Sequence, residues 1–170
     1  MSMYTASVPI FNGMLTAVAG WLDKAEAHAA EKKFDIDVLL NARLAPDMFP
    51  LAGQIKLACA FAKNGACRIA GETPPDFDLD AIKTLDDLRG LIKRTQDIVN
   101  ALPEAAIKAG GDRECTFRAG PDATMTLNGG DYLNKYALPQ FYFHVTAAYA
   151  ILRHNGVELG KKDFLGALLS

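Results

Sequence analysis

The chain has no long apolar run, no large excess of charge and no cysteine pair that local spacing would place in a disulfide. No apolar stretch reaches the roughly 18 residues that a membrane-spanning helix needs. The N-terminal stretch MSMYTASVPIFNGML lacks the basic start and the continuous apolar block of a secretory signal. These absences favour a cytoplasmic protein.

Charge is nearly balanced, with 18 basic and 20 acidic residues and a formal net charge of −2. Positive and negative residues are interspersed along the chain. The sequence therefore offers neither the basic face that binds nucleic acid nor the cationic face that binds a membrane surface. We expect neither nucleic acid nor membrane among its partners.

The three cysteines are Cys59, Cys67 and Cys115. Cys59 and Cys67 are eight residues apart in an expected helix, which separates them by about 12 Å. A disulfide requires Cα atoms within about 7 Å, so these two residues are too far apart to be bridged. We expect reduced, buried cysteines.

Helical periodicity is the dominant feature that the sequence does contain. Half of the 170 residues are hydrophobic, and a chain of this length can bury the core of one domain. Apolar residues recur at steps of three and four in four segments, which predicts helices near 3–30, 50–70, 84–102 and 130–155. The predicted fold is all-α, an up-down-type four-helix bundle in which residues 1–170 form a single domain.

Local signals mark one helix start, one interruption and one hairpin. Thr84 and Asp87 form an imperfect capping box, because Asp replaces the usual Glu or Gln. Pro139 falls inside the last helical segment and should kink or restart it. Residues 112–127 alternate in polarity around the turn AGPDA, which predicts a short β-hairpin between the third and fourth helices. A lone hairpin is marginally stable, so this one should pack on the helices.

Histidine is scarce, and two of the three histidines lie in the apolar stretch FYFHVTAAYAILRHNG. His144 and His154 are ten residues apart, roughly 15 Å along one helix, which is too far for both to bind one zinc ion. Gln140 and Ala148 stand four residues before and after His144, so neither completes a His-x-x-x-His pair. His154 suits the helix C-terminus. His28 is expected to be exposed or half-exposed.

Two interpretations of His144 remain open. It is either a core histidine satisfied by a neighbouring hydroxyl or carbonyl group, or the mouth of a pocket between helices. Gln54 and Gln140 lie near the expected inner faces and could face His144, so that a Gln–His pair orients a polar ligand without a metal. The candidate pocket is therefore Gln54, Gln140 and His144, with no metal and no cofactor, and catalytic residues stay unassigned.

Aromatic residues are concentrated in the last helical segment, as Tyr132, Tyr136, Phe141, Tyr142, Phe143 and Tyr149. An aromatic stripe is typical of a core or of a subunit interface. This stripe favours a homodimer.

Three segments carry a family resemblance: MYTASVPIF, DMFPLAGQIKLACAFAK and GDYLNKYALPQFYFHVTAAYAILRHNGVELGKKDFLG. Together with the four-helix order, they resemble the DinB/YfiT-like superfamily and, within it, a subfamily of uncharacterised bacterial proteins. The resemblance covers nearly the whole chain and implies a DinB-like four-helix bundle. Dimers occur in this superfamily, so the resemblance also favours a dimer for this protein.

The resemblance bears on metal binding as well. Members of the superfamily commonly bind a divalent metal with one histidine from the second helix and a His-x-x-x-His pair from the fourth. His144 matches the second position of that pair, and Gln140 stands at the first. The second helix contains no histidine, with residues near Leu57 and Ala58 at the corresponding turn. This chain therefore keeps one of the three ligands.

Three functions are compatible with these observations. The first is a DinB-like bundle protein that binds a small molecule near His144 without an obligatory metal. The second, implied by the resemblance, is a metal- or thiol-dependent transferase or hydrolase. The third is a non-catalytic dimeric interaction protein. The missing histidines favour the first and third, and the sequence leaves open whether the protein is an enzyme.

Overall fold

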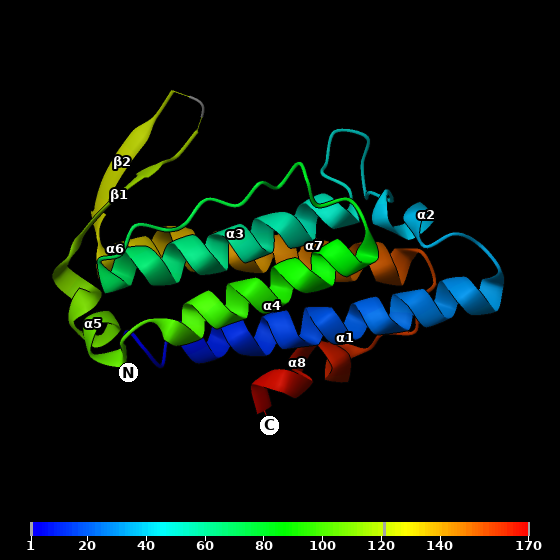
Figure 1. Cartoon of the computed structure of the whole chain (residues 1–170), viewed down its shortest axis with the longest axis horizontal. Coiled ribbons are helices and arrows are strands. Elements are labelled where there is room, and N and C mark those ends of the chain that lie inside the picture. The colour runs from blue at the N-terminus through cyan, green and yellow to red at the C-terminus, as the bar shows by residue number, and fades with distance from the viewer. Residues whose placement is uncertain (1, 121, 170) are drawn as a thin grey trace.

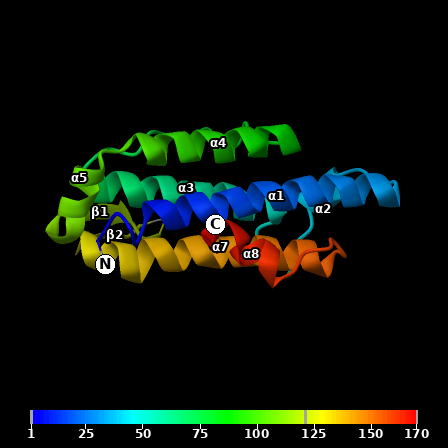
Figure 2. The same ribbon diagram turned by 90° about the horizontal axis from the view of Figure 1, so that it is seen from below.

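The structure, a computed structural model, describes residues 2–120 and 122–169. This part of the chain contains four long helices, α1 (Val8–Lys32), α3 (Leu51–Ala70), α4 (Leu85–Ala101) and α7 (Leu138–His154). They lie side by side along the long axis of the molecule (Figure 1). Figure 2 shows α4 and α7 on opposite sides of the bundle. The predicted all-α, four-helix fold is confirmed.

The order of helix directions differs from the predicted up-down arrangement. After α3 the chain does not turn back at once, because residues 71–84 run the length of α3 before α4 begins (Figure 1). Helices α3 and α4 therefore point in the same direction. An extended chain covers about 3.3 Å per residue, so this crossover loop is long enough to span the roughly 30 Å of a 20-residue helix.

The first helix starts later than predicted. Residues 3–7 form turns, in which the Ser7 hydroxyl donates to the Met3 carbonyl at 2.7 Å, and α1 begins at Val8. Pro9 explains this start, because proline suits the first turn of a helix, where its missing N–H is not needed. The predicted inner face of the helix is buried, including Phe11, which meets Phe141 of α7 edge to face at 5.0 Å.

The last long helical segment is interrupted where Pro139 predicts an interruption. Helix α6 (Gly129–Tyr132) continues into a π-helical turn at Leu133–Ala137, and α7 restarts beside the proline. Proline cannot donate the backbone hydrogen bond of a regular α-helix, and a π turn is one way for the chain to absorb that loss.

Short elements close the ends of the bundle. Helix α2 (Asp37–Leu40) precedes α3, α5 (Glu104–Lys108) follows α4, and α8 (Lys161–Leu169) packs on α1. Trp21 of α1 stacks on Phe164 of α8 and donates from Nε1 to the Asp163 carbonyl at 3.0 Å. Among the described residues, no helix combines the length and the hydropathy that crossing a lipid bilayer demands.

The predicted hairpin is present as β1 (Glu114–Arg118) paired antiparallel with β2 (Thr124–Asn128). It extends away from one end of the bundle (Figure 1). One face of the hairpin packs on the helices, since Cys115 and Phe117 are buried and the ring centre of Phe117 lies 4.3 Å from that of Tyr136.

Candidate functional site

His144 and Gln54 meet between α7 and α3. The imidazole Nδ1 lies 2.8 Å from Oε1 of Gln54, and both side chains are buried, with 6% and 1% of their surface exposed. The structure thus brings together two of the three residues that the sequence placed near the inner faces of the helices. His144 contacts α3 at Gln54 and at Phe61, which lie on either side of the turn that contains Leu57 and Ala58.

The hydrogen bonds of Gln54 define the tautomer of His144. The amide nitrogen of Gln54 donates to the backbone carbonyl of Phe49 at 3.0 Å, which turns Oε1 toward the imidazole. An amide oxygen only accepts hydrogen bonds, so Nδ1 of His144 carries the proton and Nε2 carries the lone pair. The pair therefore extends into a three-residue chain, His144 to Gln54 to Phe49.

The surroundings of His144 favour the neutral ring. Burial lowers its pKa from 6.5 to about 4. The imidazole stacks on Phe61 with ring centres 5.5 Å apart and meets the edge of Phe143 at 5.2 Å. Near neutral pH the ring is uncharged and orients Gln54, so it does not supply a proton as a general acid.

The other residues singled out by sequence do not join this pair. Gln140 is half-buried one turn before His144 and, within residues 2–120 and 122–169, has no hydrogen bond to His144 or Gln54. His154 is exposed in the last turn of α7. His28 is half-buried against Phe34, as expected. The described residues contain no group of three or more His, Cys, Asp or Glu side chains that could hold a metal ion.

The cysteines offer no reactive thiol in this fold. Cys59, Cys67 and Cys115 are free and buried, which confirms their predicted burial. Burial raises the pKa of each thiol, that of Cys59 to about 12. Because the thiolate is the nucleophile, none of the three is poised for nucleophilic attack.

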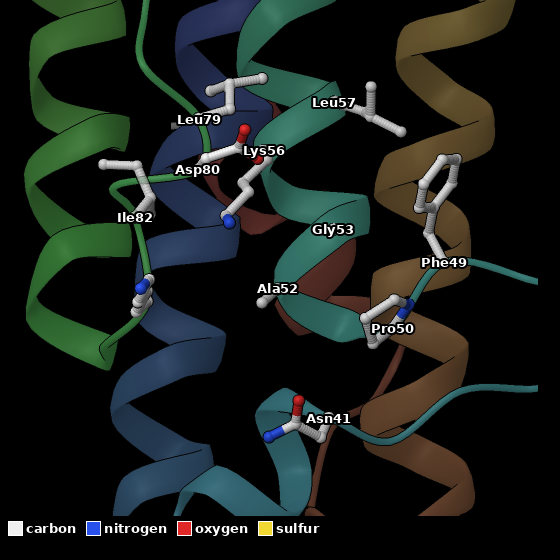
Figure 3. A pocket seen from close by; sticks show the side chains of 11 residues that line it. Asn41, Phe49, Pro50, Ala52, Gly53, Lys56, Leu57, Leu79, Asp80 and Ile82 are labelled. Atoms are coloured by element: carbon white, nitrogen blue, oxygen red, sulfur yellow. The ribbon is translucent and has the colours of Figure 1, made fainter.

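A groove of about 460 Å³ lies beside the His144–Gln54 pair, between the start of α3 and the end of the crossover loop (Figure 3). Its walls are mostly apolar, with Phe49 and Leu57 on one side and Leu79 on the other (Figure 3). The complete lining is Asn41, Phe49, Pro50, Ala52, Gly53, Lys56, Leu57, Leu79, Asp80, Ile82 and Lys83. Gln54, Gln140 and His144 are not part of this lining, but Phe49 links it to the pair.

The wall at Phe49 depends on the absence of a side chain at Gly53. A Cβ atom at Gly53 would lie 3.1 Å from Cβ of Phe49, closer than ordinary van der Waals contact. Gly53 therefore lets the Phe49 side chain lie close to the first turn of α3. The side chain stays 59% exposed, an unusual exposure for a phenylalanine.

Basic residues outnumber acidic ones around the groove. Lys56 projects from α3 and is half-buried, Lys83 lies on the opposite wall, and Asp80 is the one acidic residue of the lining. In the described part of the chain neither lysine has a carboxylate within 4 Å. The groove is thus a partly apolar hollow with a net positive rim.

A buried lysine, which sequence reasoning missed, holds the crossover loop in place. Lys63 of α3 is 5% exposed, donates to the Pro75 carbonyl, and lies 4.2 Å from the ring centre of Phe77. Arg94 of α4 also lies over that ring, at 4.8 Å. Burial lowers the pKa of Lys63, an effect opposed by Cys67 and Asp76. These contacts fix the loop that carries Leu79 and Asp80 to the groove.

Comparison with solved structures identifies the class of protein to which this four-helix fold belongs. The structure is similar to a crystal structure of a DinB family member from Shewanella denitrificans, with 41% sequence identity and a TM-score of 0.88. The match covers 96% of this chain and 91% of that one. No curated protein shows significant similarity to the chain.

The family follows from a second comparison. Residues 3–165 match the model of a domain of unknown function, DUF1993. The chain belongs to this family, as a DinB-like bundle. The resemblance predicted from the sequence is confirmed.

Proposed function

We propose that this protein binds a small molecule in the groove at the start of α3, without an obligatory metal. His144 is a positioning residue that acts through Gln54. The observation that supports the proposal is the hydrogen-bond chain from His144 through Gln54 to the Phe49 carbonyl, because it fixes the residue that forms the groove wall.

The composition of the groove also supports binding. Ligand pockets commonly have volumes of about 300 to 1,000 Å³, mostly apolar walls and a few polar groups. The groove has this size, with apolar walls at Phe49, Leu57 and Leu79. The alternative is a metal- or thiol-dependent transferase or hydrolase. It has less support, because His144 and Gln54 together provide one imidazole and one weakly coordinating amide, fewer ligands than zinc sites use.

A fragment screen by ligand-observed NMR tests the proposal. Ala52→Phe places a bulky ring on the groove wall, and Ala30→Phe makes the same change on the exposed face of α1. We expect fragments that bind the wild-type protein and Ala30→Phe to lose binding in Ala52→Phe. Fragments that bind Ala52→Phe as well as wild type, or a screen without binders, would count against the groove.

A second candidate function is dimerisation, and an apolar surface that shares Phe49 with the groove favours it. Leu44, Phe49 and Phe143 are large apolar side chains that are 43%, 59% and 55% exposed. Leu44 and Phe143 line one shallow hollow together with Met48. We call these four residues the apolar patch. Large apolar side chains that are exposed together on a protein surface often mark a site of interaction with another protein.

A further inference from the structure

We infer that the ligand of the groove is an amphipathic monoanion, with one carboxylate or sulfonate on an aliphatic or aromatic body. This inference rests on the proposed function, because it names the class of molecule that the same groove accepts.

The charge of the ligand follows from Lys56 and Lys83. They enter the groove from different elements, one from α3 and one from the segment before α4. Five lysines elsewhere on the described surface have a carboxylate partner within 4 Å, namely Lys24, Lys32, Lys93, Lys108 and Lys135, whereas Lys33, Lys161 and Lys162 have none but do not line the groove. Neither groove lysine has such a partner among the described residues, and the Asp87 carboxylate attracts Lys56 only from beyond that distance. An anion bound between the two lysines therefore meets two cations that no close ion pair neutralises.

The nearby acids limit the charge to a single negative unit. Asp87 is already occupied, because its carboxylate accepts the backbone N–H groups of Lys83 and Thr84 at 3.0 and 2.9 Å. Asp80 faces the groove and repels a second negative charge. The groove lining also contains no arginine, whose planar fork suits the bidentate recognition of phosphate groups.

The body of the ligand follows from the walls. Phe49, Leu57 and Leu79 present apolar surface, and Ile82 below them is 8% exposed. Covering that surface contributes about 25 cal/mol for each Å² removed from water, a gain that a sugar or a small inorganic anion does not provide. An apolar chain or ring with one acidic head satisfies both the walls and the lysines.

Two fluorescent probes separate the charge from the apolar body. 8-Anilinonaphthalene-1-sulfonate carries an anionic sulfonate, and N-phenyl-1-naphthylamine has a similar ring system without it. The test variant is the double substitution Lys56→Gln and Lys83→Gln. The control is Lys161→Gln and Lys162→Gln, which removes two exposed lysines of α8, remote from the groove. Circular dichroism melting of every variant confirms that it is folded.

We expect both probes to bind the wild-type protein and to lose binding in Ala52→Phe. Loss of both groove lysines should weaken binding of the sulfonate about tenfold, since it removes both cations that attract the anion at a solvent-accessible site. The neutral probe should bind the lysine variant as it binds wild type, and the control should bind both probes normally.

The outcomes distinguish the ligand class from the proposed function. If both probes lose binding in Ala52→Phe but the sulfonate binds the lysine variant as tightly as it binds wild type, the monoanion inference is wrong. The proposal that the groove binds a small molecule is then kept. The same holds if the substitutions weaken the neutral probe equally. If neither probe binds, or if Ala52→Phe binds both as wild type does, the groove and its ligand class are both rejected.

Discussion

His144 is a titratable residue that the fold keeps neutral. Its partners among the described residues are an amide oxygen and two aromatic rings, and none of these carries a negative charge that would offset the cost of burying an imidazolium. Because burial lowers the pKa of the ring, the unfolded chain binds more protons than the folded one between about pH 4 and 6.5. The stabilisation is fully present above pH 6.5 and is lost as the pH falls toward 4.

Replacing His144 should therefore flatten the pH dependence of stability. In the wild-type protein, titration of His144 should lower the unfolding free energy by at most about 3 kcal/mol as the pH falls from about 6.5 to 4. We expect this contribution to be absent in His144→Gln. Urea denaturation at several pH values measures it, with the exposed His154→Gln as control. Asp87 and Asp163 titrate below this window, because hydrogen bonds lower their pKa. An unchanged pH profile in His144→Gln would show that the ring is not held neutral.

The same residue decides metal content. Among the residues that the structure describes, His144 has one polar partner, Gln54, so we expect purified protein to contain far less than one equivalent of zinc or nickel after tag removal and dialysis. Elemental analysis by mass spectrometry measures this. One equivalent of metal in the wild-type protein that disappears in His144→Ala would restore the metal-dependent enzyme.

The sequence predicts the His144–Gln54 pair because both residues fall on the inner faces of long periodic helices. It did not predict the role of Lys63, although a lysine beside the inner face of the segment 50–70 is itself a signal. The partners of Lys63 are a backbone carbonyl and an aromatic ring from a loop. Helical periodicity says nothing about where a loop lies, so these contacts appear only in the folded chain.

At the scale of elements, the start of α4 shows how local chemistry can be predicted well. Asp87 completes the capping box although its side chain is shorter than that of Glu, because Oδ2 reaches the Thr84 N–H at 2.9 Å. Thr84 Oγ1 in turn accepts from the Asp87 N–H at 3.1 Å.

Removing this cap should cost stability and little else. We expect Thr84→Ala to lower the unfolding free energy by about 1 kcal/mol, as is typical for a lost N-cap side chain. Chemical denaturation measures the difference, and Thr73→Ala in the exposed part of the crossover loop is the matched control. Equal stability of the two variants would mean that the box contributes nothing.

The direction of α4 was the element-scale prediction that failed. Periodicity defines the faces of a helix, but it does not define which way the helix points. The available signal was the length of the segment 71–84, which exceeds the usual helix–helix connection of two to eight residues. A long connection between two helices permits a parallel arrangement.

At the scale of the whole molecule, the apolar patch predicts a second copy as its partner. Between Lys135 and Arg153 the sequence contains no acidic residue, lysine or arginine. An aromatic side chain buries about 150 to 250 Å², so the exposed parts of the patch sum to a few hundred Å². That area suits the apolar centre of a dimer interface of about 800 Å² on each partner.

We therefore expect a homodimer with two-fold symmetry in which Phe143 lies near the axis. Light scattering at tens of micromolar should give twice the 18.3 kDa mass of the chain. Phe143→Asp should give the monomer mass, whereas Met125→Asp, on the exposed hairpin, should leave the dimer intact. A monomer mass for the wild-type protein would reject this prediction.

The most direct test of a ligand site at the start of α3 is to map 8-anilinonaphthalene-1-sulfonate onto the backbone amides by heteronuclear NMR. We predict that the largest shift changes occur at Ala52, Gly53, Lys56 and Lys83, which line the groove, and that they saturate together. Changes centred on Phe143 and its neighbours in α7, with none at Gly53 or Lys83, would contradict the groove and assign the surface chemistry to the apolar patch.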